Sequence, residues 1–171
     1  YLHWPDIKTD IDESLAAIDE LHRQGKIVEF GLSNFPSYKI TQIYYKCKER
    51  RMVLPTVGQF MYNAITRDIE SHLLPCLRDL GMRGYFYNPL AGGLLTGRYE
   101  SLIDTKVATS GRFSTEFGDK SNQKPLMIAH KNRYLKQAYF DALGLIRTSC
   151  EAANVPMAEA AIRWVRHHSM L

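Results

Sequence analysis

The chain has 171 residues, of which 45% are hydrophobic and 23% charged, and its 22 Lys and Arg outnumber its 18 Asp and Glu by four. The length predicts a single domain, and the composition excludes an intrinsically disordered tail, a collagen-like repeat and a disulfide scaffold. No apolar run approaches the roughly 18 residues of a membrane span. Three widely spaced cysteines without a CxxC pair, Cys47, Cys76 and Cys150, indicate reduced thiols in a cytoplasmic protein and no metal site.

The first predicted elements alternate between strands and helices. Residues 1–3 resemble the end of a strand, and residues 13–24 place their apolar side chains at helical spacing. Residues 27–32 form a short apolar run that is typical of a strand buried on both faces. Ser37 can cap a second helix, in which the apolar residues that follow share one face.

The same alternation continues along the chain. Residues 54–59 are predicted to form a strand. Residues 69–80 have helical spacing, although Pro75 requires a kink or a nearby break. Residues 83–88 form the last predicted strand.

Residues 91 to about 125 have no sustained period and are rich in glycine. A loop of this length inside a compact domain is usually functional or disordered, so we expect a long active-site loop within a single domain, residues 1–171. Two helices are predicted to follow it, over residues 134–151 and 157–168.

Repeated strand–helix units predict a parallel sheet with helical crossovers. A doubly wound sheet and a (β/α)8 TIM barrel both fit this order. A barrel needs about 250 residues and eight strands, whereas this sequence provides four strands, one of them a stub. If the α/β fold is a barrel, we expect its C-terminal portion, incomplete at both ends, and the absence of an initiator Met also suggests a piece of a longer chain.

Polar and aromatic side chains follow each predicted strand at its carboxyl end. They are His3, Ser33 with Asn34, Gln59, and Tyr87 with Asn88. In a parallel α/β sheet these ends meet at the edge that carries the ligand. Ser, Asn and Gln suit a primary amide, which both donates and accepts hydrogen bonds, and a Tyr ring can stack on a planar group. A nicotinamide has both features.

Two of these signals have competing explanations. Ser, Asn and Gln also end strands merely to satisfy the backbone of the following loop. His3 is either a histidine bonded to a neighbouring carbonyl, or a hydrogen-bond donor or proton-transfer group that faces a substrate carbonyl. Its position at the end of a strand favours the second explanation.

Residues 92–99, GGLLTGRY, nearly form a P-loop, but Arg98 and Tyr99 replace its Lys and its Ser or Thr. We therefore exclude nucleoside triphosphate hydrolysis, while backbone N–H groups of the glycine run can still meet a pyrophosphate. Glycine as simple loop punctuation is the competing explanation. The sequence contains no metal-binding motif and no GxGxxG fingerprint, and a net charge of +4 without a basic stripe does not support nucleic-acid binding.

Residues 98–134 carry most of the positive charge, with seven Lys and Arg against four Asp and Glu. One explanation is a solvated loop. The other is a lid whose Arg98, Arg112 or Arg133 meets an anionic cofactor or substrate.

Five segments occur in an order that closely resembles the aldo-keto reductases, in particular the branch of the aflatoxin aldehyde and succinic semialdehyde reductases. They are YLHWPD, GKIVEFGLSNF, VGQFMYNAITR, YNPLAGGLLTGRY and GRF. Members of that family are (β/α)8 barrels that bind NADPH across the C-terminal face. The resemblance implies an NADPH-dependent reductase of aldehydes and ketones.

The resemblance also implies roles for individual residues. His3 matches the active-site histidine that orients and polarises the substrate carbonyl. The cofactor would be bound at the nicotinamide carboxamide by Ser33, Asn34 and Gln59, at the nicotinamide ring by Tyr87, and at the pyrophosphate by Asn88, Leu90, Gly92 and Leu95. The substrate pocket would be bordered by Trp4, Met61, Tyr62 and Asn63, with Arg112 or Arg133 against a substrate carboxylate.

The proton-donating Tyr of that family, with its Lys and Asp, has no counterpart in these residues, because all three come from earlier strands of the barrel. We therefore expect the parent protein to be the enzyme and these residues alone to be inactive. The alternative is a non-catalytic module that senses the cofactor or binds a partner, as in the channel-associated β-subunits that resemble this family. The expected partner is a small aldehyde or ketone, with no nucleic acid, membrane or metal. Whether the protein forms a homodimer is left open.

Overall fold

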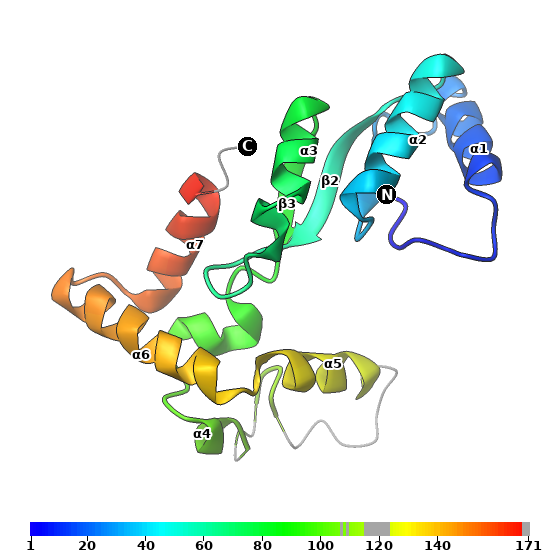
Figure 1. The fold of residues 1–171 in the computed structure, drawn as a ribbon. Coiled ribbons are helices and arrows are strands. Elements are labelled where there is room, and N and C mark those ends of the chain that lie inside the picture. Colours follow the sequence, from blue (N-terminus) through cyan, green and yellow to red (C-terminus); the bar gives the residue numbers. More distant parts are fainter. Residues whose placement is uncertain (107, 109, 115–123, 169–171) are drawn as a thin grey trace. The chain divides into compact units, whose positions relative to one another are not determined.

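The structure is a computed structural model that describes residues 1–106, 108, 110–114 and 124–168. Its chain forms two compact units (Figure 1). Unit 1 contains Tyr1–Met61 and Asp68–Tyr87, and unit 2 contains Tyr62–Arg67 and Asn88–His168. Each unit has its own hydrophobic core.

The sheet of unit 1 is parallel, as the alternation of strands and helices predicts. Its strands β1 (Phe30–Ser33), β2 (Pro55–Met61) and β3 (Arg83–Tyr87) lie in chain order. The predicted stub is present as a single parallel bridge between Leu2 and Leu32. The register places Ser33 opposite Gln59, and Met61 opposite Tyr87, so the carboxyl ends of all the strands lie along one edge.

Three helices cover one face of this sheet (Figure 1). They are α1 (Ile11–Arg23), α2 (Ser37–Glu49) and α3 (Leu73–Asp79). Phe30, Leu32 and Phe60 point from the strands into the core, where they meet buried side chains of all three helices. Because neighbouring residues of a strand alternate between faces, Ser33, Gln59 and Met61 lie on the other face.

The helix predicted over residues 69–80 is interrupted in the structure. A short 3₁₀ turn, η1 (Asp68–Glu70), precedes α3, which begins at Leu73. Pro75 is the third residue of α3, where its missing N–H would have no partner within the helix. The proline thus marks the break that the sequence required.

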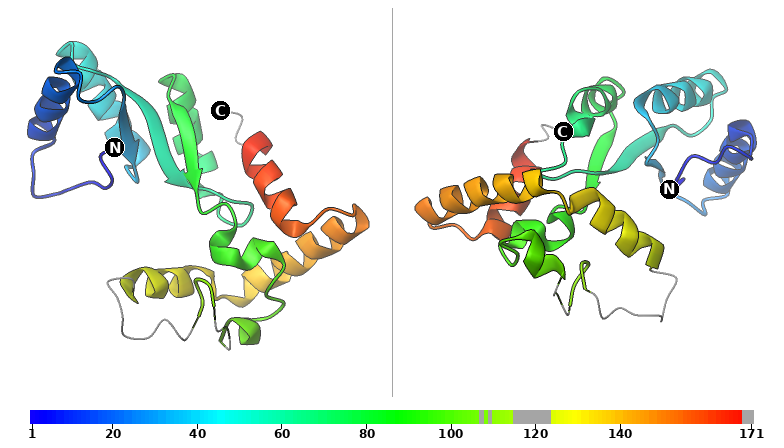
Figure 2. Two further views of the ribbon diagram at one scale, coloured as in Figure 1. Left: turned by 180° about the vertical axis from the view of Figure 1, so that it is seen from behind. Right: turned by 60° about the horizontal axis from the view of Figure 1, so that its bottom comes forward.

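Unit 2 is helical. Its elements are η2 (Ala91–Thr96), α4 (Leu102–Lys106), α5 (Lys124–Tyr134), α6 (Gln137–Ala152) and α7 (Met157–His168), of which α6 (orange) and α7 (red) form a neighbouring pair (Figure 2). Residues of η2, α6 and α7 pack around Phe113 and Tyr134, which are both fully buried. The helix predicted over 157–168 is confirmed at both ends.

The predicted loop over residues 91–125 is wrong where η2 and α4 form, although its residues 107, 109 and 115–123 lie outside the described residues. Elements of five or six residues are too short to show a helical period. No sequence pattern predicts α5, because its apolar and charged residues do not separate onto two faces.

Candidate functional site

The polar residues predicted at the strand ends of unit 1 meet at one edge of its sheet. His3 follows the Leu2 bridge, Ser33 ends β1, and Asn34 comes directly after it. Gln59 lies near the end of β2, and Tyr87 is the last residue of β3. The parallel register brings them together, as expected for consecutive strands of a parallel sheet.

Asn34 links these strand ends through its side-chain amide. Its Nδ2 donates to the backbone oxygen of His3 at 2.9 Å and to Ser33 Oγ at 3.0 Å. The Tyr87 hydroxyl donates to Asn34 Oδ1 at 2.8 Å, and Ser33 Oγ donates to the backbone oxygen of Gln59 at 2.9 Å. Asn34 has a left-handed backbone, with φ of 63°, which Asn tolerates better than most residues. One amide therefore connects the stub, β1 and β3 directly, and β2 through Ser33.

This network leaves some hydrogen-bonding capacity for a ligand. Both N–H groups of the Asn34 amide are used, while Asn34 Oδ1 and Ser33 Oγ each keep an acceptor position. The half-buried Gln59 amide has no hydrogen-bond partner within the described part of the chain. A primary amide bound here could exchange a donor and an acceptor with Gln59 and donate to the spare acceptor positions.

Three further predicted residues of unit 1 border this edge. The His3 side chain is exposed and makes no hydrogen bond to any residue that the structure describes, although its backbone is fixed by Asn34. Trp4 is 66% exposed, and Met61 is half-buried at the end of β2. His3 and Trp4 are therefore accessible to a small molecule.

In unit 2, the predicted pyrophosphate segment forms a tight turn. Asn88, Ala91, Gly92 and Gly93 all have positive φ, at 63°, 50°, 70° and 110°. The N–H of Ala91 donates to the backbone oxygen of Asn88 at 3.0 Å, and that of Gly92 donates to Asn88 Oδ1 at 2.8 Å. The Gly93 N–H donates to the backbone oxygen of Leu90 at 2.8 Å. These three N–H groups therefore shape the turn itself.

The glycine at position 92 has a packing role as well. A Cβ there would lie 3.1 Å from His130 and 3.2 Å from Phe113, so a side chain would displace the core of unit 2. Leu95 is also buried in that core, at 1% exposure, whereas Leu90 is half-buried. Of the predicted pyrophosphate residues, Asn88, Leu90 and Gly92 keep some exposed surface, and Leu95 does not.

Tyr62 and Asn63, predicted at the substrate pocket, are both fully buried. The Tyr62 ring lies 4.9 Å from that of Trp164, centroid to centroid. Asn63 Nδ2 donates to the backbone oxygen of Asn88 at 3.0 Å and to the Tyr134 hydroxyl at 3.2 Å, and Asn63 Oδ1 accepts from the Ile65 N–H. The side chain of Asn63 thus binds the turn formed by residues 88–93, which we call the Asn88 turn.

The two candidate arginines differ in exposure. Arg112 is exposed and Arg133 is half-buried near the end of α5, and neither guanidinium has an ion-pair or hydrogen-bond partner within the ranges described. Arg98 interacts with two of the described residues. Its Nη2 donates to Ser110 Oγ at 2.7 Å, and its guanidinium lies 5.6 Å from the centre of the Tyr99 ring. Among the described residues, Arg98 is therefore engaged by polar and aromatic neighbours, whereas the guanidinium groups of Arg112 and Arg133 are not.

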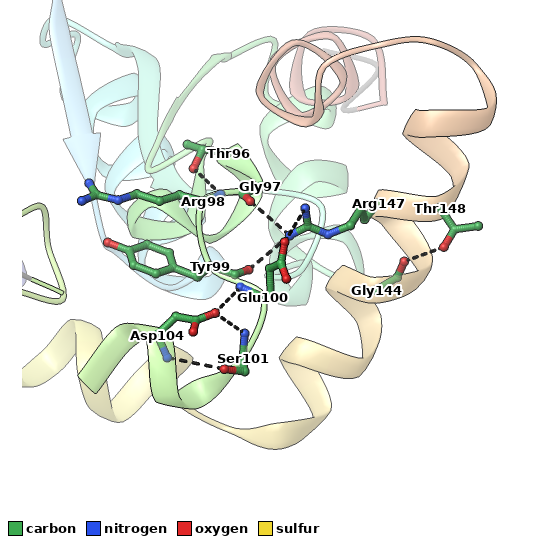
Figure 3. A network of polar contacts seen from close by, with 10 residues as sticks. All are labelled: Thr96, Gly97, Arg98, Tyr99, Glu100, Ser101, Asp104, Gly144, Arg147 and Thr148. Carbon is green, nitrogen blue, oxygen red and sulfur yellow. Dashed lines mark hydrogen bonds and ion pairs between the residues drawn. The ribbon is translucent and has the colours of Figure 1, made fainter. Parts of the chain in front are cut away.

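Sequence reasoning missed Arg147 of α6, which fixes the segment after η2 (Figure 3). Its Nη2 donates to the backbone oxygens of Gly97 at 3.1 Å and Tyr99 at 3.5 Å, and its Nη1 lies 3.6 Å from Glu100 Oε1. The Asp104 carboxylate accepts the N–H groups of Glu100 and Ser101, both at 2.8 Å, which lowers the pKa of Asp104. A single arginine on an amphipathic helix gives no sequence signal of such a role.

Other kinds of site find no support in the described residues. They contain no cluster of three or more potential metal ligands and no helix that could span a membrane. A hollow of about 430 Å³ in unit 1 lies between the Pro5–Ile11 segment and α2. None of the predicted site residues lines it, so we place the candidate site at the sheet edge and not in this hollow.

Comparison with known proteins identifies the family of this chain. The model of the aldo/keto reductase family matches residues 1–171. Aflatoxin B1 aldehyde reductase member 2 of Rattus norvegicus is 45% identical over 100% of this chain and 46% of that protein. Aldo-keto reductase family 7 member A3 of Homo sapiens is 43% identical over 100% of this chain and 50% of that protein.

The chain spans about half the length of the curated relatives that it matches. Its structure is similar to that of the glycerol dehydrogenase AKR11B4 from Gluconobacter oxydans, a TIM barrel, with a TM-score of 0.66 and 28% identity over 95% of this chain and 44% of that one. The predicted fold class, part of a (β/α)8 barrel with an unclosed sheet, is confirmed. The chain belongs to the aldo/keto reductase family.

Proposed function

We propose that the protein to which this chain belongs reduces aldehydes or ketones to alcohols with NADPH. The observation that carries the proposal is the edge of unit 1, where the Gln59 amide, which has no hydrogen-bond partner among the described residues, lies on the same strand ends as Ser33, Asn34 and Tyr87. Family membership supports the same reaction class. The three cysteines are free, in keeping with a reducing compartment such as the cytosol.

The donor set of this edge fits a nicotinamide carboxamide. Gln59 supplies one donor and one acceptor, and Asn34 Oδ1 and Ser33 Oγ supply acceptors for its NH₂ group. The Tyr87 ring, held by its hydroxyl on Asn34, provides a flat surface for the nicotinamide ring. When bound, the reduced cofactor supplies a hydride. Asn88, Leu90, Gly92 and Leu95 would form the segment beside the pyrophosphate.

His3 is proposed to orient the substrate carbonyl. Its imidazole is exposed, and its backbone is fixed by the Leu2 bridge and by Asn34, so a hydrogen bond from the ring to the carbonyl oxygen would start from a positioned group. Trp4 and Met61 would border the same substrate. Arg112 or Arg133 would bind a carboxylate on the substrate.

Proton transfer to the substrate oxygen is assigned to a Tyr outside these residues. Loss of a general acid costs about 10²–10⁴-fold in rate, so we propose that the 171-residue chain by itself has negligible turnover. The full-length protein is therefore the form to test.

Gln59→Ala in the full-length protein tests the cofactor site. Removal of the amide should raise the dissociation constant for NADPH about tenfold, because one or two hydrogen bonds to the carboxamide are lost. Gln42→Ala is the matched control, since Gln42 is an exposed amide on α2 that lines no part of the edge. The affinity of the Gln42 variant for NADPH should stay unchanged. Titration of protein fluorescence with NADPH measures both.

Steady-state turnover with a panel of aldehydes completes the test. NADPH oxidation that depends on the aldehyde supports the reductase proposal. Tight NADPH binding without turnover by the full-length protein would contradict it and favour the non-catalytic module. Equal NADPH affinities of the Gln59 and Gln42 variants would show that the carboxamide does not bind at the sheet edge.

A further inference from the structure

The Asn88 turn adopts a backbone conformation that its sequence alone does not favour. Four of its six residues from 88 to 93 have positive φ, and two of them, Asn88 and Ala91, are not glycine. A left-handed residue with a Cβ is strained, and such strain persists only where the surroundings hold it. Side chains outside the turn must therefore supply part of the constraint.

Two buried residues outside the turn, Asn63 and Tyr134, supply it through hydrogen bonds with Asn88, and we name the three residues together the turn clamp. The hydroxyl of Tyr134, the last residue of α5, accepts from Asn88 Nδ2 at 2.7 Å and from Asn63 Nδ2 at 3.2 Å. Asn63 Nδ2 also donates to the backbone oxygen of Asn88 at 3.0 Å. Both the side chain and the backbone of Asn88 are thus held from outside the turn.

The clamp continues into the glycine run. With Nδ2 directed to Tyr134, Asn88 directs Oδ1 to the Gly92 N–H at 2.8 Å. A chain of hydrogen bonds therefore runs from the end of α5 to Gly92. Asn63 and Tyr134 are each 0% exposed, so neither can touch a ligand, and the loss of either removes a hydrogen bond made to Asn88.

We propose that Asn63 and Tyr134 are positioning residues, which hold the Asn88 turn in the shape that the cofactor's phosphates require. This inference rests on the proposed function, in which the turn borders the pyrophosphate. It assigns Asn63 a role different from the substrate contact that the sequence suggests. It also makes α5, a helix without a clear sequence signal, a support of the cofactor site.

Two variants of the full-length protein, Asn63→Ala and Tyr134→Phe, test the proposal against a matched control. Tyr139→Phe is that control, because the Tyr139 ring packs against Tyr134 at 5.9 Å while its hydroxyl lies outside the clamp. NADP⁺ affinity is measured by calorimetry, the aldehyde KM at saturating NADPH, and hydrogen exchange at the Gly92 amide by NMR or mass spectrometry.

We expect Asn63→Ala to weaken NADP⁺ binding about tenfold and Tyr134→Phe by about threefold to tenfold, since each removes hydrogen bonds that hold the turn. Exchange at Gly92 should become faster in both variants. The aldehyde KM should stay within about twofold of wild type, because the clamp does not touch the substrate. Tyr139→Phe should change none of the three quantities.

Each other outcome is decisive. Unchanged exchange at Gly92 in both variants would show that the pair does not hold the turn. Faster exchange with unchanged NADP⁺ affinity would show that the clamp only stabilises the fold, which would overturn the positioning role. If the wild-type protein binds neither NADP⁺ nor NADPH, the proposed function fails, and the positioning role toward the cofactor fails with it, whatever the exchange at Gly92 shows.

Discussion

The thiols of this chain differ in their surroundings. Cys47 of α2 is 1% exposed, and burial, with a smaller contribution from the charge of Asp19, raises its pKa to about 11. Cys76 of α3 is half-buried, with its Sγ 3.4 Å from Thr41 Oγ1. Cys150 is buried in the core of unit 2. Access favours reaction at Cys76, whereas burial and the raised pKa disfavour reaction at Cys47.

Alkylation should therefore modify Cys76 first. At about pH 8, well below a pKa of about 11, very few Cys47 thiols are ionised. Iodoacetamide labelling of the native full-length protein, followed by peptide mass spectrometry, should show Cys76 labelled well before Cys47. Labelling in urea is the control, because it should remove the difference. Equal native rates would mean that the helices covering the sheet open readily.

The residues at the strand ends could be predicted from the sequence, whereas their hydrogen-bond partners could not. His3, Ser33, Asn34, Gln59 and Tyr87 follow predicted strands, and a parallel sheet must place them on one edge. Both N–H groups of the Asn34 amide donate to the protein, whereas the Gln59 amide makes no hydrogen bond to the described residues. This difference depends on side-chain orientation. Hydrogen-bond assignments of this kind lie beyond a sequence pattern.

At the scale of elements, α1 is tied to the loop that leads into β2 by one buried carboxylate. Asp19 is 7% exposed, accepts the Val53 N–H at 2.8 Å and pairs with Arg23 at 2.7 Å. Asp19→Ala should lower the free energy of unfolding by about 1–3 kcal/mol, because it leaves a backbone N–H without a partner.

Urea denaturation of the full-length protein measures this effect. Asp19→Asn is the matched variant, since its side-chain oxygen can still accept from Val53, and it should lose much less stability than the Ala variant. A loss as large in the Asn variant would assign the effect to the ion pair with Arg23 instead.

The contact between α1 and α2 gives a dependence of stability on pH. Lys46 and Arg50 bind the Asp12 carboxylate, and these hydrogen bonds hold its pKa below the usual value, with Lys46 as the larger cause. A carboxyl whose pKa is lower in the folded state stabilises the fold above its unfolded pKa and loses this effect as the pH falls through the folded pKa.

Asp12→Asn should therefore lower the urea midpoint at about pH 7, by a small amount because the pair is partly exposed to solvent. The difference from wild type should shrink as the pH falls below the unfolded pKa of about 4, and it should disappear once the folded carboxyl, whose pKa is lower, is also protonated. A difference that stays constant over this range would show that the charge of Asp12 does not contribute.

Elements with a strong pattern could be predicted, and short or weakly patterned ones could not. The apolar face of α2 and the predicted range 157–168 of α7 match the structure. η2 is different, because its left-handed residues interrupt any helical period. Its conformation depends on the turn clamp, which brings together residues up to 71 positions apart.

At the scale of the whole molecule, most of the buried hydrophobic residues that the structure describes belong to one of two cores, which share no residue. Length alone predicts one domain, and hydrophobic periodicity identifies which side chains are buried without assigning them to a core. The chain passes from unit 1 to unit 2 between Met61 and Tyr62 and again between Tyr87 and Asn88. Both passages lie directly beyond the strand ends that carry predicted site residues.

The Asn34 network also has a consequence for how the sheet folds. Asn34 bonds to a residue 31 positions earlier in the chain and to another 53 positions later. Contacts between such distant residues form more slowly than local ones because the intervening chain must first be ordered. We therefore expect the network to be completed late on the folding pathway, after β3 has joined β2. The bonds that shape the candidate site thus also mark the completion of this parallel sheet.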